Sequence, residues 1–210
     1  MNSEKHKVIL LVENETNVAN SEAMTLKKYF FKVITVNSGE EAIKTVNSKQ
    51  KIDLILMSIN LGGGIDGPHA AETILKNRDI PIVFLLSHSE REVIKTEGIT
   101  SYGYFIKDSG ETILIASINM ALKLFDAKIK EREKEEAYRI LFENASTGIY
   151  ITQDDKIKIF NPAVIKISGY PTDVILSKPF ISFMHPDDIE MVVDRYKRRL
   201  AGEMVEQATQ

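Results

Sequence analysis

The sequence predicts an α/β fold, a doubly wound sheet of five parallel strands, followed by a smaller α+β unit. Three observations lead to this prediction. Between residues 7 and 125, short apolar runs alternate with amphipathic segments, as in sheets that helices cover on both faces. Polar residues directly follow several of these runs. Near Tyr138 the pattern changes to short apolar runs separated by turn residues, which indicates a second unit.

Each apolar run is short and bounded by polar or turn-forming residues, which is typical of a buried strand. The predicted strands span residues 8–12, 32–36, 54–57, 82–86 and 104–106. The segments between them place apolar residues at helical spacing. The predicted helices span residues 18–30, 40–46, 68–75 and 90–97, and a fifth begins at residue 111.

The fifth helix is predicted to be unusually long. Ser109 is a plausible cap, and the chain then runs to Asn144 without a proline and without a glycine after Gly110. Four apolar residues follow 4-3-4 spacing, namely Ile118, Leu122, Phe125 and Ile129. Such spacing would form a seam between two helices, whereas Arg132 and Glu136 continue it with charges. A dimerising coiled coil and a solvated linker helix both fit.

The second unit is predicted to begin with a hairpin of residues 148–152 and 158–160, joined by the turn residues 153–155. Pro162 opens a helix that Gly169 ends, and a last helix starts at residues 185–188 and continues to 201–202. The expected domains are therefore residues 1–125, a helical linker over 126–137, and a partial domain over 138–210.

Composition narrows the possible partners. The net charge of −3 gives no general attraction to nucleic acid or anionic lipid, so proteins are the expected partners. No apolar run reaches the roughly 18 residues of a membrane span, and residues 1–6 lack signal-peptide features, so we expect a cytoplasmic location. The absence of cysteine excludes disulfides and thiolate metal sites.

Function in a doubly wound sheet lies beyond the carboxyl ends of the strands. Those ends carry a distinctive set of side chains. The first run ends in Glu13 and Asn14, the third in Ser58, and the fifth in Lys107. The fourth ends in Leu86 and Ser87.

Four segments in this order resemble response regulator receiver domains: VILLVENE at 8–15, DLILMSINL at 53–61, PIVFLLSH at 81–88 and GYFIK at 103–107. The resemblance implies a flavodoxin-like fold over residues 7–125. It also implies a site in which two acids after strand one and an aspartate ending strand three hold Mg²⁺. That aspartate accepts phosphate from a phosphohistidine, and a hydroxyl residue and a lysine contact the phosphate.

By this resemblance Glu13 matches the first acid, Lys107 the phosphate-binding lysine, and Tyr104 an aromatic residue that rotates upon activation. Asn14 replaces the second acid and Ser58 the phospho-accepting aspartate. Leu86 also stands where a hydroxyl residue is expected, beside Ser87. The resemblance thus predicts a pseudo-receiver with a vestigial phosphoacceptor site, in which Glu13 and Lys107 form an ion pair.

The replacements are expected to prevent phosphotransfer. Mg²⁺ requires charged oxygen ligands, and one carboxylate in place of three removes two charges. We therefore expect neither a metal nor another cofactor, with Glu13 and Asn14 as the only weak Mg²⁺ ligands. Ser58 is expected to be unactivated, because the sequence places no base or spare carboxylate beside it. Asp53 and Asp66 are alternative acceptors, but Asp53 opens a strand and Asp66 is better explained as a helix cap.

The second unit resembles PAS sensor domains through the segments YRILFEN at 138–144, TGIY at 147–150, FNPA at 160–163, SGY at 168–170 and HPDD at 185–188. A complete PAS domain adds three further strands. A flavin adduct would need a cysteine, and His185 precedes the long helix on which a haem ligand is expected, so no cofactor is predicted.

The leading expectation is a non-enzymatic module of two-component signalling that acts through protein contacts and conformational relay. The alternatives are an active phosphoreceiver with an atypical site, a fragment of a sensor histidine kinase, and a small α/β enzyme using Glu13 and Lys107. The expected partners are other signalling proteins or histidine kinase domains, with a possible homodimer through the linker helix.

Overall fold

The structure is a computed structural model that describes residues 6–48, 50–87 and 102–204. The chain divides into two compact units, residues 1–131 and 132–210. Within the described ranges, no helix is long and apolar enough to cross a membrane.

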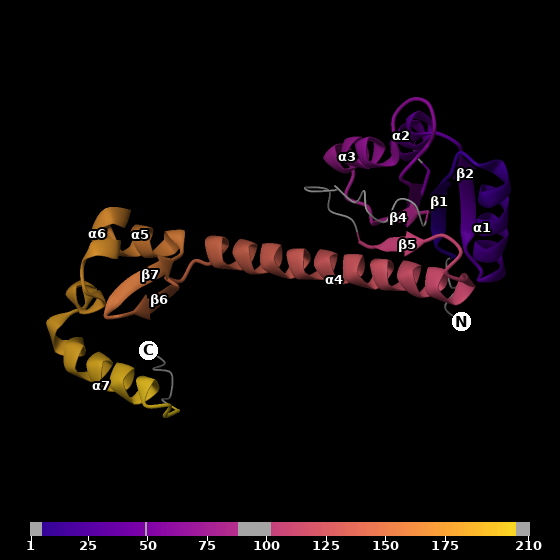
Figure 1. Cartoon of the computed structure of the whole chain (residues 1–210). Coiled ribbons are helices and arrows are strands. Elements are labelled where there is room, and N and C mark those ends of the chain that lie inside the picture. The colour runs from indigo at the N-terminus through magenta and orange to yellow at the C-terminus, as the bar shows by residue number, and fades with distance from the viewer. Residues whose placement is uncertain (1–5, 49, 88–101, 205–210) are drawn as a thin grey trace. The chain divides into compact units, whose positions relative to one another are not determined.

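The first unit is built on a five-stranded parallel sheet with the order β2-β1-β3-β4-β5 (Figure 1). The strands are β1 (Val8–Val12), β2 (Lys32–Val36), β3 (Leu54–Ser58), β4 (Ile82–Leu86) and β5 (Tyr104–Ile106). This confirms the predicted α/β fold and its five strands. The difference is that β3 extends one residue further and ends on Ser58 itself, whose Cα pairs with Leu85 in β4.

The described helices of this unit are α1 (Thr16–Lys28), α2 (Gly39–Asn47), α3 (Gly67–Asn77) and the first part of α4 (Glu111–Asn144), which continues into the second unit. Local caps fix where two of them begin. The Ser38 hydroxyl accepts from the Glu41 N–H at 3.2 Å at the start of α2, and Asp66 caps α3 in the same way. The predicted helix over 90–97 lies outside the described residues. The long fifth helix is confirmed as α4, which ends at Asn144 as predicted.

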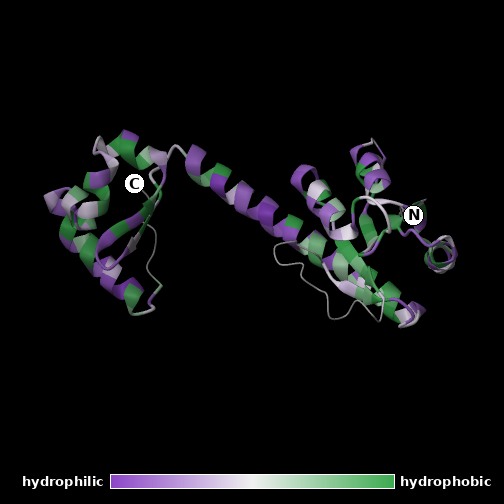
Figure 2. Cartoon of the chain, turned by 45° about the horizontal axis from the view of Figure 1, so that its top comes forward, coloured by the Kyte–Doolittle hydropathy of each residue, from purple (hydrophilic) through white to green (hydrophobic). Residues whose placement is uncertain are grey.

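Alternate residues of each strand face opposite layers. Leu10 and Val12 of β1 pack with residues of α2 and α3, whereas Ile9 and Leu11 pack with α1 and α4. Both layers are apolar, so β3 and β4 are buried along their full length. Figure 2 shows the sheet of the first unit largely in the hydrophobic colour, while the long helix α4 carries hydrophilic stretches.

The first turns of α4 belong to the core of the first unit. Ile118 and Leu122 are buried against the sheet, in the cluster that also contains Val83. The ring of Phe125 meets that of Tyr102 edge-on at 5.5 Å between centroids. The alternative of an intermolecular seam through these positions is therefore wrong, because the protein's own sheet occupies that face of the helix.

The second unit contains an antiparallel hairpin of β6 (Tyr150–Gln153) and β7 (Lys156–Phe160). Asp154 and Asp155 form its two-residue loop with φ of 51° and 58°. Two consecutive positive φ angles match the right-handed twist of the strands, and aspartate tolerates them better than most residues. The predicted hairpin is confirmed, with β6 starting two residues later and β7 two residues earlier than expected.

Three helices follow, α5 (Pro162–Ser168), α6 (Thr172–Ser177) and α7 (Ile189–Leu200), with single turns at Phe180–Phe183 and Pro186–Asp188. Gly169 ends α5 with φ of 71°, as its position predicts. The core of this unit is small and is formed by Ile157, Ile175 and Phe180 with partly buried neighbours. Asn161 is fully buried, and its amide bonds the N–H of Ile149 and the carbonyl of Thr147, both at 2.9 Å.

Candidate functional site

Three of the predicted site residues meet at the carboxyl edge of the sheet. Glu13 follows β1, Ser58 ends β3 and Lys107 follows β5. The Glu13 carboxylate is fully buried, and its Oε2 atom accepts a hydrogen bond from Ser58 Oγ at 2.5 Å. The same atom lies 2.6 Å from the ammonium of Lys107, whose side chain is 18% exposed. The predicted Glu13–Lys107 ion pair is therefore present and is largely removed from solvent.

The other oxygen of Glu13 is also occupied. Its Oε1 atom accepts from the backbone N–H of Glu15 at 3.0 Å. Asn14, oriented with its amide nitrogen toward the site, donates to the same oxygen at 3.0 Å and to the carbonyl of Asn60 at 3.2 Å. An aspartate at position 14 would bring a second negative charge beside Glu13. Asparagine replaces that repulsion with a hydrogen bond.

The prediction that no base or spare carboxylate lies beside Ser58 missed the Glu13 carboxylate, which lies beside the hydroxyl although it is paired with Lys107. It failed because the sequence order separates positions 13 and 58 by 45 residues, whereas β1 and β3 are neighbours in the sheet. The neighbouring order of strands one and three in doubly wound sheets was the signal that could have revealed the contact. The Glu13 oxygen that accepts the Ser58 hydrogen bond is also paired with the Lys107 ammonium, so it is not a free acceptor for the serine proton.

The donor set does not fit Mg²⁺. A divalent ion would need several anionic oxygens, and Glu13 supplies the only carboxylate of the cluster formed with Ser58 and Lys107. The ammonium of Lys107 lies against the oxygen that would face the ion. In the described part of the chain, no group of three or more His, Cys, Asp and Glu residues has an arrangement that could hold a metal.

The remaining predicted residues lie nearby with different surroundings. Leu86 is buried in β4, and its carbonyl accepts from the Lys107 N–H at 2.7 Å, which fixes the backbone that presents the lysine. Ser87 follows Leu86 at the same edge. The ring of Tyr104 is partly exposed and stacks on Phe84 with centroids 5.9 Å apart.

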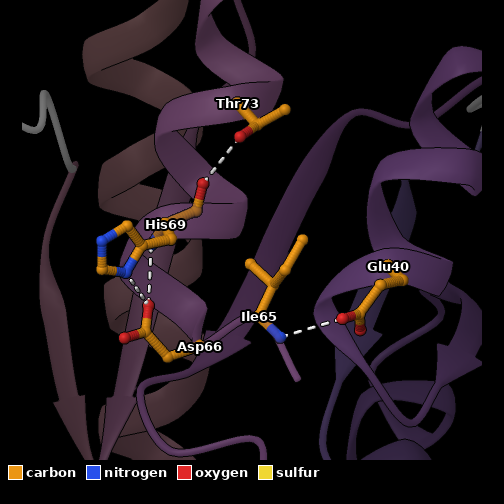
Figure 3. A network of polar contacts seen from close by, with 5 residues as sticks. All are labelled: Glu40, Ile65, Asp66, His69 and Thr73. Atoms are coloured by element: carbon orange, nitrogen blue, oxygen red, sulfur yellow. Dashed lines mark hydrogen bonds and ion pairs between the residues drawn. The ribbon is translucent and has the colours of Figure 1, made fainter.

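The two alternative acceptors are engaged elsewhere. Asp53 precedes β3 at the opposite edge of the sheet, where it accepts from the Val8 N–H at 2.8 Å and pairs with Lys51 at 3.2 Å. Asp66 caps α3, as predicted. Its Oδ1 atom accepts from the backbone N–H of His69 at 2.9 Å and lies 2.7 Å from that residue's Nδ1 (Figure 3).

The glycine-rich loop between β3 and α3 is held by acceptors of the protein itself. Glu40 accepts from the N–H of Ile65 at 2.9 Å (Figure 3), and the Asn60 side chain accepts from the N–H of Gly62 at 3.0 Å. Hydrogen bonding to Ile65 lowers the pKa of the Glu40 carboxyl below its ordinary value. These N–H groups therefore hold the loop in place by bonding within the protein, and they do not form a phosphate-binding loop.

Gly67 is required where α3 approaches the site. A Cβ atom there would lie 2.1 Å from the carbonyl oxygen of Ser58, and the Gly67 N–H donates to Ile59 at 2.9 Å. We expect Gly67→Ala to destabilise the first unit by about 2 kcal/mol or more, because rigid backbone must shift. Gly63→Ala, where a Cβ meets nothing within 4 Å, should change stability little. Equal thermal denaturation midpoints for the two variants would contradict this explanation.

Glu22 of α1 also borders this site, although it was not among the predicted residues. Its Oε2 atom is buried without a hydrogen-bond partner within the described residues. Burial raises the pKa of Glu22 from 4.5 to about 7; repulsion from Glu13 and Asp108 adds to this rise, whereas Lys107 opposes it. The side chain borders a cavity of about 520 Å³ that Lys107, Asp108 and Glu111 also line. A glutamate on a polar helix gives no sequence signal of such burial.

Comparison with known proteins identifies the family of the first unit. The family described as response regulator receiver domain matches residues 9–119, more than half of the chain. An uncharacterised transcriptional regulatory protein of Bacillus subtilis (strain 168), YrkP, is 28% identical over 134 residues, 63% of this chain and 56% of that protein. The chain thus spans little more than half the length of this curated relative.

Solved structures agree. The N-terminal domain of a response regulator/sensory box/GGDEF three-domain protein from Carboxydothermus hydrogenoformans is 39% identical, with a TM-score of 0.56, over 59% of this chain and 99% of that one. The signal receiver domain of a modulated diguanylate cyclase from Desulfovibrio desulfuricans G20 is 25% identical, with a TM-score of 0.55 and the same coverage. The family match over more than half of the chain, together with the five-stranded parallel sheet, shows that the chain belongs to the response regulator receiver family of two-component signalling.

Proposed function

We propose that this receiver domain does not accept phosphate and works as a pseudo-receiver that signals through protein contacts. The observation that carries the proposal is the closed cluster of Glu13, Ser58 and Lys107, in which the acid, the hydroxyl and the cation satisfy one another. In this proposal the domain is not an enzyme and needs no metal, and its partners are histidine kinase domains or other signalling proteins.

Electrostatics supports this proposal. A phosphoryl group brings negative charge, and it would compete with Glu13 for Lys107 at a site without a compensating dication. Separating Lys107 from Glu13 would leave a fully buried carboxylate without a cation. The side chain of Leu86 offers no hydrogen bond to a phosphate oxygen.

We also propose that the second unit is a PAS-like sensor unit. The hairpin of β6 and β7 followed by short helices fits the PAS resemblance of residues 138–204. A relative whose N-terminal domain is similar to this one combines a response regulator with a sensory box, which is the same order of parts. We propose that residues 126–137 link a receiver-like domain over 1–125 to a PAS-like domain over 138–210, and that conformational change passes along α4.

Intact mass after incubation with Mg²⁺ and acetyl phosphate tests the proposal. The wild-type chain is expected to gain no phosphoryl group. A hydroxylamine-labile gain would overturn the proposal, and a stable gain would indicate a serine phosphoester at Ser58. The matched variant carrying Asn14→Asp and Ser58→Asp restores two carboxylates and should bind Mg²⁺ more tightly, whereas Ser58→Asp alone should improve binding less. Isothermal titration with Mg²⁺ measures both.

A further inference from the structure

Exposed apolar side chains form a stripe along α4 that does not face the sheet. Its large members are 50–73% exposed, and they are Ile113, Met120, Leu124, Tyr138 and Leu141. By contrast, Ile118 is fully buried on the face that packs on the sheet. Here these five residues, with Ser117, Ala127, Glu131 and Lys134 between them, are called the α4 stripe.

The spacing of the α4 stripe is that of a coiled coil. Its nine positions, from 113 to 141, are separated alternately by four and three residues. This is the spacing of the d and a positions of successive heptads, which form the seam of a coiled coil. In this register Ile113, Met120, Ala127 and Leu141 occupy d positions, while Leu124 and Tyr138 occupy a positions. Leu114 and Ala121, at two of the flanking e positions, are buried in the receiver core, whereas the g positions Ala116, Lys123 and Lys130 are exposed beside the seam.

We propose that the α4 stripe is the seam of a parallel, in-register homodimer, with the same helix of a second copy as its occupant. The inference goes beyond the proposed function and holds whether or not the receiver site takes phosphate.

Charge complementarity favours the second copy in this orientation. The stripe is interrupted by Glu131 at an a position and Lys134 at a d position. In a parallel pair, an a residue lies beside the preceding g residue of the partner helix, and a d residue beside the following e residue. Glu131 would therefore lie beside Lys130 of the second copy, and Lys134 beside Glu135 of the second copy. Each charged layer would be neutralised from across the seam.

An antiparallel pair fits less well. In an antiparallel pair, the a positions of one helix face the d positions of the other. If Met120 faced Tyr138 of the second copy, Leu124 would face Lys134 of that copy. This arrangement would bury an ammonium against an apolar side chain in two layers. The parallel arrangement instead matches apolar layers with themselves at both ends of the stripe.

Cysteine crosslinking tests the seam and its direction, since the chain contains no native cysteine. Leu124→Cys and Tyr138→Cys, introduced singly in the full chain, are each expected to form an intermolecular disulfide under mild oxidation. Asn119→Cys, at an exposed c position outside the stripe, is the control and should crosslink weakly. Crosslinking only when Met120→Cys and Tyr138→Cys chains are mixed would indicate antiparallel pairing and overturn the proposed orientation.

Sedimentation equilibrium across the micromolar range tests the dimer itself. Leu124→Glu should raise the dimer dissociation constant at least about 100-fold, because an apolar layer of both copies is lost. Asn119→Glu adds the same charge outside the seam and should leave the constant nearly unchanged. Glu131→Leu combined with Lys134→Leu should tighten the dimer, an increase that damage to the fold would not produce. A monomeric wild-type chain at all concentrations, or no tightening by the double variant, would overturn the proposal.

Discussion

Replacing Lys107 by methionine is expected to lower the free energy of unfolding of residues 1–131 by about 3 kcal/mol at neutral pH. The substitution removes the cation that lies 2.6 Å from the fully buried Glu13 carboxylate and leaves it with hydrogen-bond donors alone. Methionine retains much of the volume of the lysine stem, so lost packing contributes little. Native-state amide exchange in β1 and β3 follows this unit separately from the second one.

A double-mutant cycle separates the ion pair from other effects of the substitution. Glu13→Gln with Lys107→Met removes both charges, and this double variant should be more stable than Lys107→Met alone. The coupling energy is expected to be about 2 kcal/mol. Additive losses in the two single variants would mean that Glu13 and Lys107 contribute independently and that the cluster is not the electrostatic unit proposed above.

Glu22→Gln is expected to stabilise the first unit at alkaline pH and to change its stability little at pH 5. Because burial raises the pKa of Glu22 from 4.5 to about 7, the folded state retains a proton that the unfolded state has already released within this range. The stabilisation from protonated Glu22 is fully present below pH 4.5 and is lost as pH rises through about 7. The shift corresponds to about 3 kcal/mol, which glutamine, having no charge to bury, would not lose.

The measurement is the free energy of unfolding between pH 5 and pH 8.5 for both proteins. The wild-type curve should fall relative to that of Glu22→Gln by about 2–3 kcal/mol across the interval. Glu72→Gln is the matched control, since Glu72 is an exposed helical glutamate whose pKa is lowered by Lys76. Parallel curves for wild type and Glu22→Gln would show that Glu22 titrates normally.

The sheet and most helix boundaries could be predicted because they depend on local pattern. The continuous apolar run at 54–57 requires burial on both faces, and only a parallel sheet between two helical layers supplies it. The pairing of Glu13 with Lys107 could be predicted as well, since the carboxyl ends of parallel strands lie at one edge of the sheet.

The contacts that could not be predicted depend on which face of an element meets which neighbour. The 4-3-4 spacing of Ile118, Leu122 and Phe125 identifies an apolar face of α4 but does not say whether the sheet or a second helix covers it. Ser58 and Glu22 present the same difficulty, because a polar side chain carries no periodic sign of burial. In both cases the tertiary arrangement decides the surroundings, and spacing along the chain does not.

The packing of α4 on the sheet has a consequence for how the rest of that helix forms. The equilibrium constant for forming the first turn of a helix in water is on the order of 10⁻³, whereas the constant for adding each further residue is close to about 1. Leu114 and Ile118 are fixed by the core, so the initiating turn of α4 already exists when the domain folds. The charged segment at 126–137 then only has to propagate that turn. As an isolated peptide the same segment would spend most of its time as random coil.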